Sequence, residues 1–255
     1  FVRTIQHQGR LHPLGSWRQR INVTEALRQR HVYPAPEPGG GKTFIPLWLF
    51  ELINEQRRMN NQPRGKMLYV SPKMVLDDLP NRVRPNTVQG PPNHCYYVPG
   101  LEPTVGVVQG GMTIEQMNAA LANEVVFWPY SMLHATRDDE SLYARIISYR
   151  DPQTGVPFTQ VVFDEAQLLK GNGEWNRIGW EIVHRTEGLY DQGNVMFMSG
   201  TPATNHLGDL RNVAEILEPR TEGQENVRGR RNRNGERSLH PAVMRNMLER
   251  VIILD

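Results

Sequence analysis

The stretch Pro36-Glu-Pro-Gly-Gly-Gly-Lys-Thr43, followed by the apolar residues 44–50, decides the fold that we expect for this chain. Glycines let backbone N–H groups turn towards an anion, and the N-terminus of a following helix adds a favourable dipole. The side chain of Lys42 can then reach the outer phosphates of a nucleotide, and the hydroxyl of Thr43 can hold Mg²⁺. Pro36 stands where the usual phosphate-binding loop has its first glycine. A glycine-rich turn that only joins a strand to a helix is therefore the alternative.

The composition allows one large α/β domain or two small ones in 255 residues. An apolar content of 38% can build a core, and a net charge of +2 neither demands nor excludes nucleic acid. Cys95 is the single cysteine, so no intramolecular disulfide forms and we expect a reducing compartment. The longest apolar run, residues 44–50, is too short to span a bilayer, so no membrane partner is predicted.

Apolar strands alternate with helical patterns along the chain, which predicts an α/β fold with a mostly parallel sheet covered on both faces. Polar turns follow the strands, at the carboxyl edge where such sheets bind ligands. The expected strands are residues 32–33, 67–70, 105–109, 124–128, 160–163 and 194–198. The expected helices are residues 17–30, 42–59, 74–79, one that begins at Thr113 with a capping box to Gln116, 138–149, 175–185 and 207–217.

This pattern predicts a nucleotide-binding domain over residues 1–219, with residues 1–30 as a helical lead-in. Residues 220–240 are expected to be a basic linker, and residues 241–255 the start of a following element, so that the chain is expected to be part of a longer protein. The arginines of residues 228–237 are either a solvated linker or contacts to a phosphate backbone. Residues 80–111 are expected to be mostly loop, with no assigned function.

The chemistry depends on polar residues that follow the expected strands. Asp164 and Glu165 come directly after a Val-Val-Phe strand, where one carboxylate can hold Mg²⁺ and the second can orient or activate the attacking water. An Asp-Glu pair in a solvated loop is the alternative. The pair occurs together with Gly-Gly-Gly-Lys-Thr, and this combination favours a nucleotide site.

Three of these motifs also resemble those of the Swi/Snf-like ATPases, a branch of the superfamily-two helicases. Ala35-Pro-Glu-Pro-Gly-Gly-Gly-Lys-Thr43 is similar to their Ala-Asp-Glu-Met-Gly-Leu-Gly-Lys-Thr segment, in which the first Walker glycine is also absent. Val162-Phe-Asp-Glu-Ala-Gln-Leu-Leu-Lys-Gly171 resembles their Asp-Glu-Ala-His box. Met198-Ser-Gly-Thr-Pro-Ala-Thr-Asn205 resembles their third motif. The resemblance covers roughly residues 17–219 and implies a three-layer RecA-like P-loop NTPase fold.

The resemblance implies an ATP-binding lobe of a DNA-dependent ATPase that moves on double-stranded DNA, with ATP and Mg²⁺ as cofactors. Lys42 would bind the β- and γ-phosphates, and Glu165 would position the hydrolytic water. The metal ligands would be Thr43 and Asp164. Gln167 replaces the usual histidine and can still hydrogen-bond to the third motif. The implied nucleotide-binding residues are Gln19, which reads the adenine, with Gly39, Gly40, Gly41, Lys42 and Thr43.

The resemblance also implies a nuclear location and three kinds of partner: double-stranded DNA, a second RecA-like lobe of the same parent chain, and chromatin proteins. The implied nucleic-acid residues are Ser71, Lys73, Tyr130 and Thr201, the last in the segment that couples the ATP state to DNA contact. Each weaker match has a structural alternative: a solvated lysine for Lys73, a packing residue for Tyr130 and an exposed helix residue for Gln19.

Two other functions remain open at this point. One is a scaffold or binding module that keeps the fold without turnover, suggested by the proline-rich loop and the long 80–111 segment. The other is an RNA helicase of the same superfamily, although the Gly-Thr-Pro in the third motif favours the Swi/Snf-like branch. Nothing after Pro219 resembles a second lobe, which in this family supplies arginine fingers. The chain alone is therefore expected to bind nucleotide weakly and hydrolyse it poorly.

Overall fold

The computed structural model describes residues 4–7, 10–13, 17–34, 42–80, 103–137, 140–169, 174–199, 216–217 and 251–252. The glycine-rich residues 39–41, the third motif beyond Ser199 and the arginine-rich residues 228–237 lie outside these ranges.

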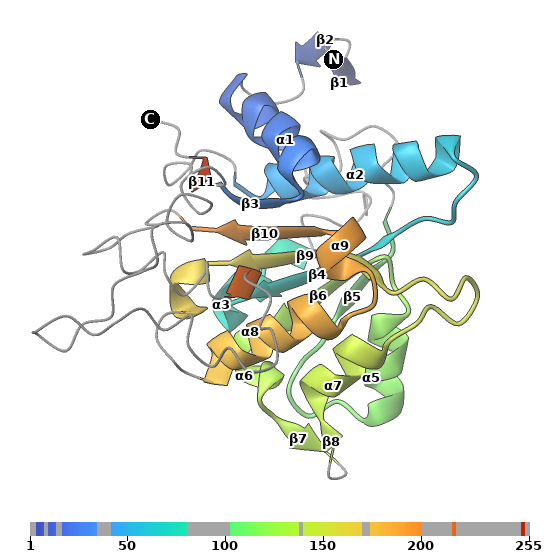
Figure 1. Cartoon of the computed structure of the whole chain (residues 1–255), viewed down its shortest axis with the longest axis vertical. Helices are drawn as coiled ribbons and strands as arrows, with labels where there is room; N and C mark the ends of the chain where they lie inside the picture. Colours follow the sequence, from blue (N-terminus) through green and yellow to red (C-terminus); the bar gives the residue numbers. More distant parts are fainter. Residues whose placement is uncertain are drawn as a thin grey trace, which may run out of the picture.

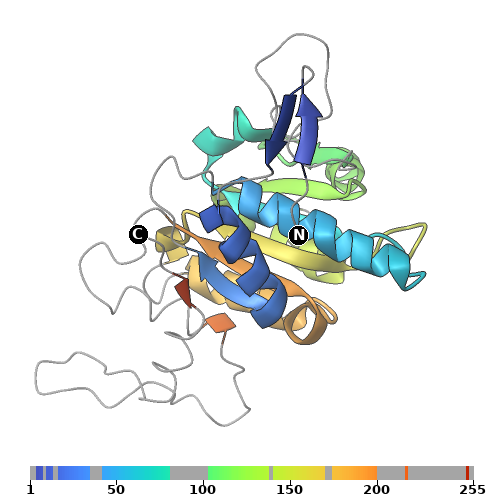
Figure 2. The ribbon, with the colours of Figure 1, turned by 90° about the horizontal axis from the view of Figure 1, so that it is seen from above.

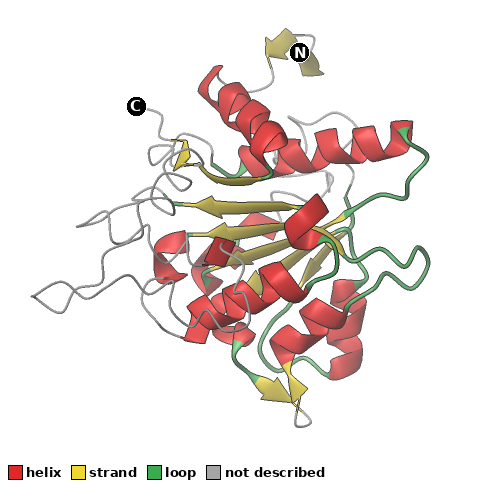
Figure 3. Cartoon of the chain, viewed as in Figure 1, coloured by secondary structure: helices red, strands yellow, loops and turns green. Residues whose placement is uncertain are grey.

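A seven-stranded parallel sheet forms the middle of the molecule, in the order β11-β3-β10-β9-β4-β6-β5 (Figures 1 and 3). Each strand is joined to the next along the chain by a crossover, as parallel neighbours require. The strands are β3 (His31–Pro34), β4 (Lys66–Ser71), β5 (Val105–Val107), β6 (Val125–Pro129), β9 (Phe158–Asp164), β10 (Asn194–Met198) and β11 (Val251–Ile252).

Helices cover both faces of this sheet. In Figure 1 the helices α1 and α2 lie above the sheet, and α5, α7 and α8 lie below it; Figure 2 shows α1 and α2 crossing the strands from above. The long helices are α1 (Trp17–Gln29), α2 (Phe44–Met59), α5 (Ile114–Leu121), α7 (Leu142–Ser148) and α8 (Glu174–Arg185). The short ones are α3 (Lys73–Leu76), α6 (Tyr130–Leu133), α9 (Leu189–Gln192) and the 3₁₀ turn η2 (Ala166–Leu169).

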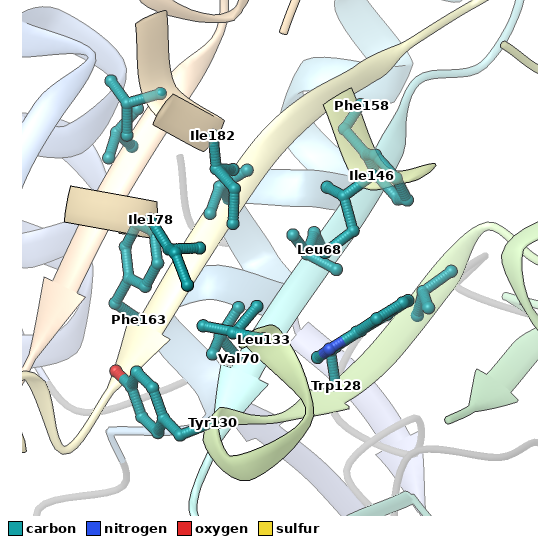
Figure 4. Packing of buried hydrophobic residues seen from close by; sticks show 14 of the residues in the cluster. Leu68, Val70, Trp128, Tyr130, Leu133, Ile146, Phe158, Phe163, Ile178 and Ile182 are labelled. Carbon is teal, nitrogen blue, oxygen red and sulfur yellow. The ribbon is translucent and has the colours of Figure 1, made fainter. Parts of the chain in front are cut away.

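Side chains of each strand alternate between two apolar clusters, one on each face. In β4, Leu68 and Val70 face the cluster of α5, α7 and α8 (Figure 4), whereas Met67 and Tyr69 face the cluster of α1 and α2. Complete burial of one large apolar side chain contributes about 1.5–3 kcal/mol. A surface ion pair contributes about 0–1 kcal/mol. The two apolar clusters, more than the surface ion pairs, therefore hold the helices on the sheet. Consistent with this, all six residues of β4 are buried.

The structure confirms the predicted α/β class with a parallel sheet and helices on both faces. Each of the six expected strands is present, and the predicted capping box is formed: Thr113 accepts from the backbone N–H of Gln116, and the Gln116 side chain accepts from that of Thr113. In the described part of the chain, no helix is long and apolar enough to cross a membrane, and α2, at 16 residues, is the longest.

Three predictions about boundaries are wrong. The lead-in is not purely helical, because β1 (Thr4–His7) and β2 (Arg10–Pro13) form an antiparallel hairpin before α1. The helix expected over 138–149 begins at Leu142, since β7 (Thr136–Arg137) and β8 (Glu140–Ser141) form a small hairpin before it. The sheet also extends past residue 219, because β11 pairs in parallel with β3, so its residues belong to this sheet instead of a following element.

Candidate nucleotide and metal site

The candidate site lies at the carboxyl edge of the sheet, where β4, β9 and β10 end side by side. In Figure 1 the arrows of β9 and β10 point towards the same edge. The parallel register pairs Met198 with Asp164, and Val70 with Phe163 one position earlier. Because the register is parallel, Ser71 at the end of β4 and Ser199 after β10 flank Asp164 at the end of β9. This is the edge where open α/β sheets bind ligands.

Asp164 is the buried carboxylate of the site, with 7% of its surface exposed. Its Oδ2 accepts hydrogen bonds from the Tyr69 hydroxyl at 3.1 Å and from the Ser71 hydroxyl at 3.3 Å. Its Oδ1 accepts from the backbone N–H of Glu165 at 3.0 Å. Both oxygens are therefore held by donors of this chain, and the carboxylate plane is defined by three hydrogen bonds.

Burial raises the pKa of the Asp164 carboxyl above its ordinary value, and the neighbouring charge of Glu165 raises it further. The hydrogen bond from Tyr69, the ammonium of Lys42 and the backbone N–H of Glu165 act in the opposite direction and do not cancel the effect. A cation bound next to Asp164 would favour the ionised form of this carboxyl group.

Lys42 and Glu165 form an ion pair across the site, with Nζ and Oε1 3.5 Å apart. The two side chains are 18% and 32% exposed, so water and ligands can reach both. Lys42 lies in the turn before α2, and Thr43 is the N-cap residue that directly precedes the helix. The Thr43 side chain makes no capping hydrogen bond to the helix, so its hydroxyl is not committed to the α2 N-terminus.

A chain of short hydrogen bonds continues from Glu165 to the end of β10. The Gln167 amide donates to Glu165 Oε2 at 2.6 Å, and the Ser199 hydroxyl donates to Gln167 Oε1 at 2.6 Å. The expected hydrogen bond between Gln167 and the third motif is thus present. Glu165 has a φ of 50°, a left-handed conformation that non-glycine residues rarely adopt, and such conformations concentrate at functional sites. Glu165 thus has this conformation at the centre of the interactions that run from Lys42 through Glu165 and Gln167 to Ser199.

The donor set fits Mg²⁺. Mg²⁺ prefers oxygen ligands and is usually held by one or two protein groups together with substrate phosphates and water. Asp164 offers a carboxylate at the strand end, and Thr43 offers a hydroxyl that caps no backbone N–H. Among the described residues no cluster of three or more His, Cys, Asp or Glu side chains could hold a metal, and a Mg²⁺–nucleotide site does not need one.

Several predicted site residues are not tested by these contacts. Gly39, Gly40, Gly41 and Thr201 lie outside the described residues. Gln19 is in α1 and only 9% exposed, so the alternative of an exposed helix residue is wrong, whereas its role towards an adenine stays a prediction. Lys73 is exposed at the start of α3, two residues after the end of β4, and its contact to nucleic acid stays a prediction.

Two predicted nucleic-acid residues are corrected. Ser71 is completely buried and bonded to Asp164, and Tyr130 is 2% exposed with its ring 5.6 Å from that of Trp175. Figure 4 shows Tyr130 packed beside Leu133 and Val70. Neither side chain can reach a DNA backbone in this conformation. Tyr130 is therefore a packing residue, and Ser71 belongs to the carboxylate network.

The sequence interpretation missed Tyr69, which contributes the 3.1 Å hydrogen bond to Asp164. The signal was weak but present. Alternation along residues 66–71 places Tyr69 and Ser71 on the same face of one strand, and a buried tyrosine hydroxyl needs a polar partner. The identity of the partner depends on the order of strands in the sheet, which the sequence did not supply.

Comparison with known proteins supports the fold. A crystal structure described as the Pyrococcus furiosus Hef helicase domain superposes with a TM-score of 0.52 at 18% sequence identity. The match covers 78% of this chain and 36% of that one, so the chain spans about a third of that structure's length. No protein-family description matches the sequence, and no curated protein does. The fold is that of a RecA-like helicase domain, and this likeness does not single out a Swi/Snf-like subtype.

Proposed function

We propose that this chain is the ATP-binding lobe of a helicase-like ATPase whose parent protein acts on nucleic acid. The observation that carries the proposal is the ion pair of Lys42 with Glu165, next to the buried Asp164, at the carboxyl edge of a RecA-like sheet. This arrangement combines a cation for phosphates with two carboxylates in different surroundings. Such a division of roles is what phosphoryl transfer to water requires.

Each group has a role that follows from its surroundings. When bound, Mg²⁺ would neutralise charge on the β- and γ-phosphates. Asp164, held by three hydrogen bonds, and the hydroxyl of Thr43 would hold the ion. Glu165 is more exposed and would orient the attacking water and accept its proton. Because Lys42 contacts Glu165 here, nucleotide phosphates would compete for the ammonium and leave the Glu165 carboxylate available to water.

The hydrogen bonds from Glu165 through Gln167 to Ser199 support a link between the nucleotide and the segment after β10. We propose that this segment and the exposed Lys73 communicate with nucleic acid. The motif resemblance favours double-stranded DNA and a Swi/Snf-like translocase, in which a second lobe supplies the arginine finger. The chain alone is accordingly expected to bind Mg²⁺–ATP weakly and to turn it over slowly.

Nucleotide binding by the chain is the first test. A fluorescent ATP analogue is titrated in the presence of Mg²⁺, and Lys42→Ala is expected to weaken binding by at least about tenfold, a loss of about 1.4 kcal/mol. Arg185→Ala, which breaks a surface ion pair with Glu181 at the end of α8, is the matched control and should leave the affinity unchanged. No Mg²⁺-dependent binding by the unmodified chain would favour a scaffold module instead.

The nucleic-acid partner is tested on the parent protein that contains this chain. We expect its ATPase rate to rise with double-stranded DNA and to be abolished by Lys42→Ala. Stimulation by single-stranded RNA alone would assign the protein to the RNA helicases. No stimulation by any nucleic acid would contradict the proposal.

A further inference from the structure

Two hydroxyl groups of β4 converge on one oxygen of the candidate metal carboxylate. The Tyr69 hydroxyl lies 3.1 Å and the Ser71 hydroxyl 3.3 Å from Asp164 Oδ2, and each residue is 0% exposed. The backbone N–H of Glu165 occupies the other oxygen, Oδ1. Neither hydroxyl has a role in the proposed ATP hydrolysis, in which the phosphates, the metal and the water are bound by other residues.

The arrangement follows from strand pairing. β4 and β9 are parallel neighbours with Tyr69 opposite Val162, so Asp164, two residues further on, projects from the same face as Tyr69 and Ser71. The Tyr69 ring packs 5.1 Å from the ring of Phe127 inside the apolar cluster under α2. A completely buried ring cannot turn its hydroxyl to water, so the donor stays on Asp164.

We propose that Tyr69 and Ser71 are positioning residues that hold the Asp164 carboxylate in the orientation that Mg²⁺ requires. The inference rests on the proposed function. Both donors are on Oδ2, which fixes the plane of the carboxylate and leaves Oδ1 with a single donor. Mg²⁺ demands near-ideal octahedral geometry, whereas Ca²⁺ accepts variable geometry and coordination number. A fixed carboxylate therefore supports Mg²⁺ more than it supports Ca²⁺.

The expected consequence is a change in metal affinity and selectivity. Removing an outer hydrogen bond from a metal ligand commonly costs about 10–100-fold in metal affinity or activity. We expect Tyr69→Phe to raise the Mg²⁺ concentration for half-maximal nucleotide binding by about tenfold, and Ser71→Ala to act in the same direction. The corresponding Ca²⁺ concentration should rise less, by about threefold or below, because Ca²⁺ tolerates a carboxylate that is free to rotate.

The experiment titrates Mg²⁺ and, separately, Ca²⁺ into the chain at a fixed concentration of a fluorescent ATP analogue. Tyr149→Phe is the matched control, since it also removes a buried tyrosine hydroxyl. This hydroxyl has no hydrogen-bond partner among the described residues. The Tyr149 ring lies 5.1 Å from Lys66 Nζ, at the opposite edge of the sheet from Asp164. It should leave both metal titrations within about twofold of the unmodified chain. Circular dichroism and the midpoint of thermal unfolding show that each variant is folded.

The outcomes separate this inference from the proposed function. If the unmodified chain shows no Mg²⁺-dependent nucleotide binding, the proposed function is overturned and the inference falls with it. If the unmodified chain binds, but Tyr69→Phe and Ser71→Ala match it in the Mg²⁺ titration, the inference alone is overturned. Equal losses for Mg²⁺ and Ca²⁺ also overturn it, because they indicate general loosening of the site. If Tyr69→Phe does not fold, Ser71→Ala decides by the same criteria.

Discussion

Lys66 offers the sharpest test of how this sheet is stabilised, because its ammonium group is buried at the start of β4. Its side chain is 4% exposed, and its Nζ donates to Asp151 Oδ2 at 3.1 Å and to the carbonyl of Ala122 at 2.9 Å. The ring of Tyr149 lies 5.1 Å from the same nitrogen. Burial lowers the pKa of Lys66, while the hydrogen bond and charge of Asp151 partly restore it.

Asp151→Asn is expected to destabilise the protein much more than Lys66→Met. The Asn variant keeps an acceptor for the 151–154 turn but leaves the ammonium without its counter-charge. Breaking a buried pair in this way costs about 3–5 kcal/mol. Because the Asp151 side chain is 18% exposed and the Ala122 carbonyl remains as an acceptor, we expect a loss at or just below the lower end of that range, about 2–3 kcal/mol.

Lys66→Met removes the buried charge itself and replaces it with an apolar chain of similar length. Asp151 keeps three donors on Oδ1, from the backbone of Gln153 and from the backbone and hydroxyl of Thr154, and it also reaches water. Removing one partner of a buried pair is costly when it leaves an uncompensated buried charge. Asp151 is not left in that state, because it is 18% exposed and keeps its three donors, so we expect a change within about 1 kcal/mol.

The assay is chemical denaturation followed by circular dichroism, which yields the free energy of unfolding for each variant. Arg28→Met breaks the exposed pair with Glu25, whose arginine side chain is 70% exposed, and as a control should change stability by about 0.5 kcal/mol or less. A larger loss for Lys66→Met than for Asp151→Asn would refute the reasoning, because it would mean that the buried pair contributes net stability.

The pH dependence gives an independent check on the same pair. A lysine whose folded pKa lies below its unfolded value of 10.5 binds fewer protons when folded. Stability therefore rises as the pH increases from the folded pKa towards 10.5. Without Asp151 the folded pKa of Lys66 falls further, so the deficit of Asp151→Asn should be smaller at about pH 9.5 than at about pH 7.

Two further predictions concern the sheet edge and the candidate metal site. Gly106→Ala in β5 places a Cβ atom 2.1 Å from the carbonyl oxygen of Ala120, and denaturation should show a loss of about 1–3 kcal/mol. Gly110→Ala meets open space and should change stability by about 0.5 kcal/mol or less, and equal losses would contradict the geometry. Asp164→Asn should stabilise the metal-free protein by about 1 kcal/mol at neutral pH, because burial raises the pKa of Asp164 above 3.8. The stability that the unmodified protein gains from protonated Asp164 is present below pH 3.8 and is lost as the pH rises through the raised pKa of Asp164. Asp164→Asn should therefore have no advantage at about pH 3, and a stability gain that persists there would argue against this cause.

The order of elements was predictable because its signals are local. The buried run that became β4 and the apolar run before Asp164 read as strands from their composition, and Thr113 with Gln116 read as a helix start. The position of Lys42 and Asp164 at one edge also followed, since parallel strands end together at that edge. The early hairpin of β1 and β2 was not predicted, because its polar residues show no apolar alternation.

The sequence by itself determined the class of the fold and placed Lys42, Asp164 and Glu165 at one edge of the sheet. Only the tertiary structure decided which neighbours those groups have. That β4 lies next to β9 is a property of the sheet order, and it turns Ser71 inward and makes Tyr69 a partner of Asp164. Packing of α6 against Trp175 of α8 likewise buries Tyr130. Strand identity depends on local composition, whereas side-chain partners depend on contacts between residues far apart in the chain, which no local pattern contains.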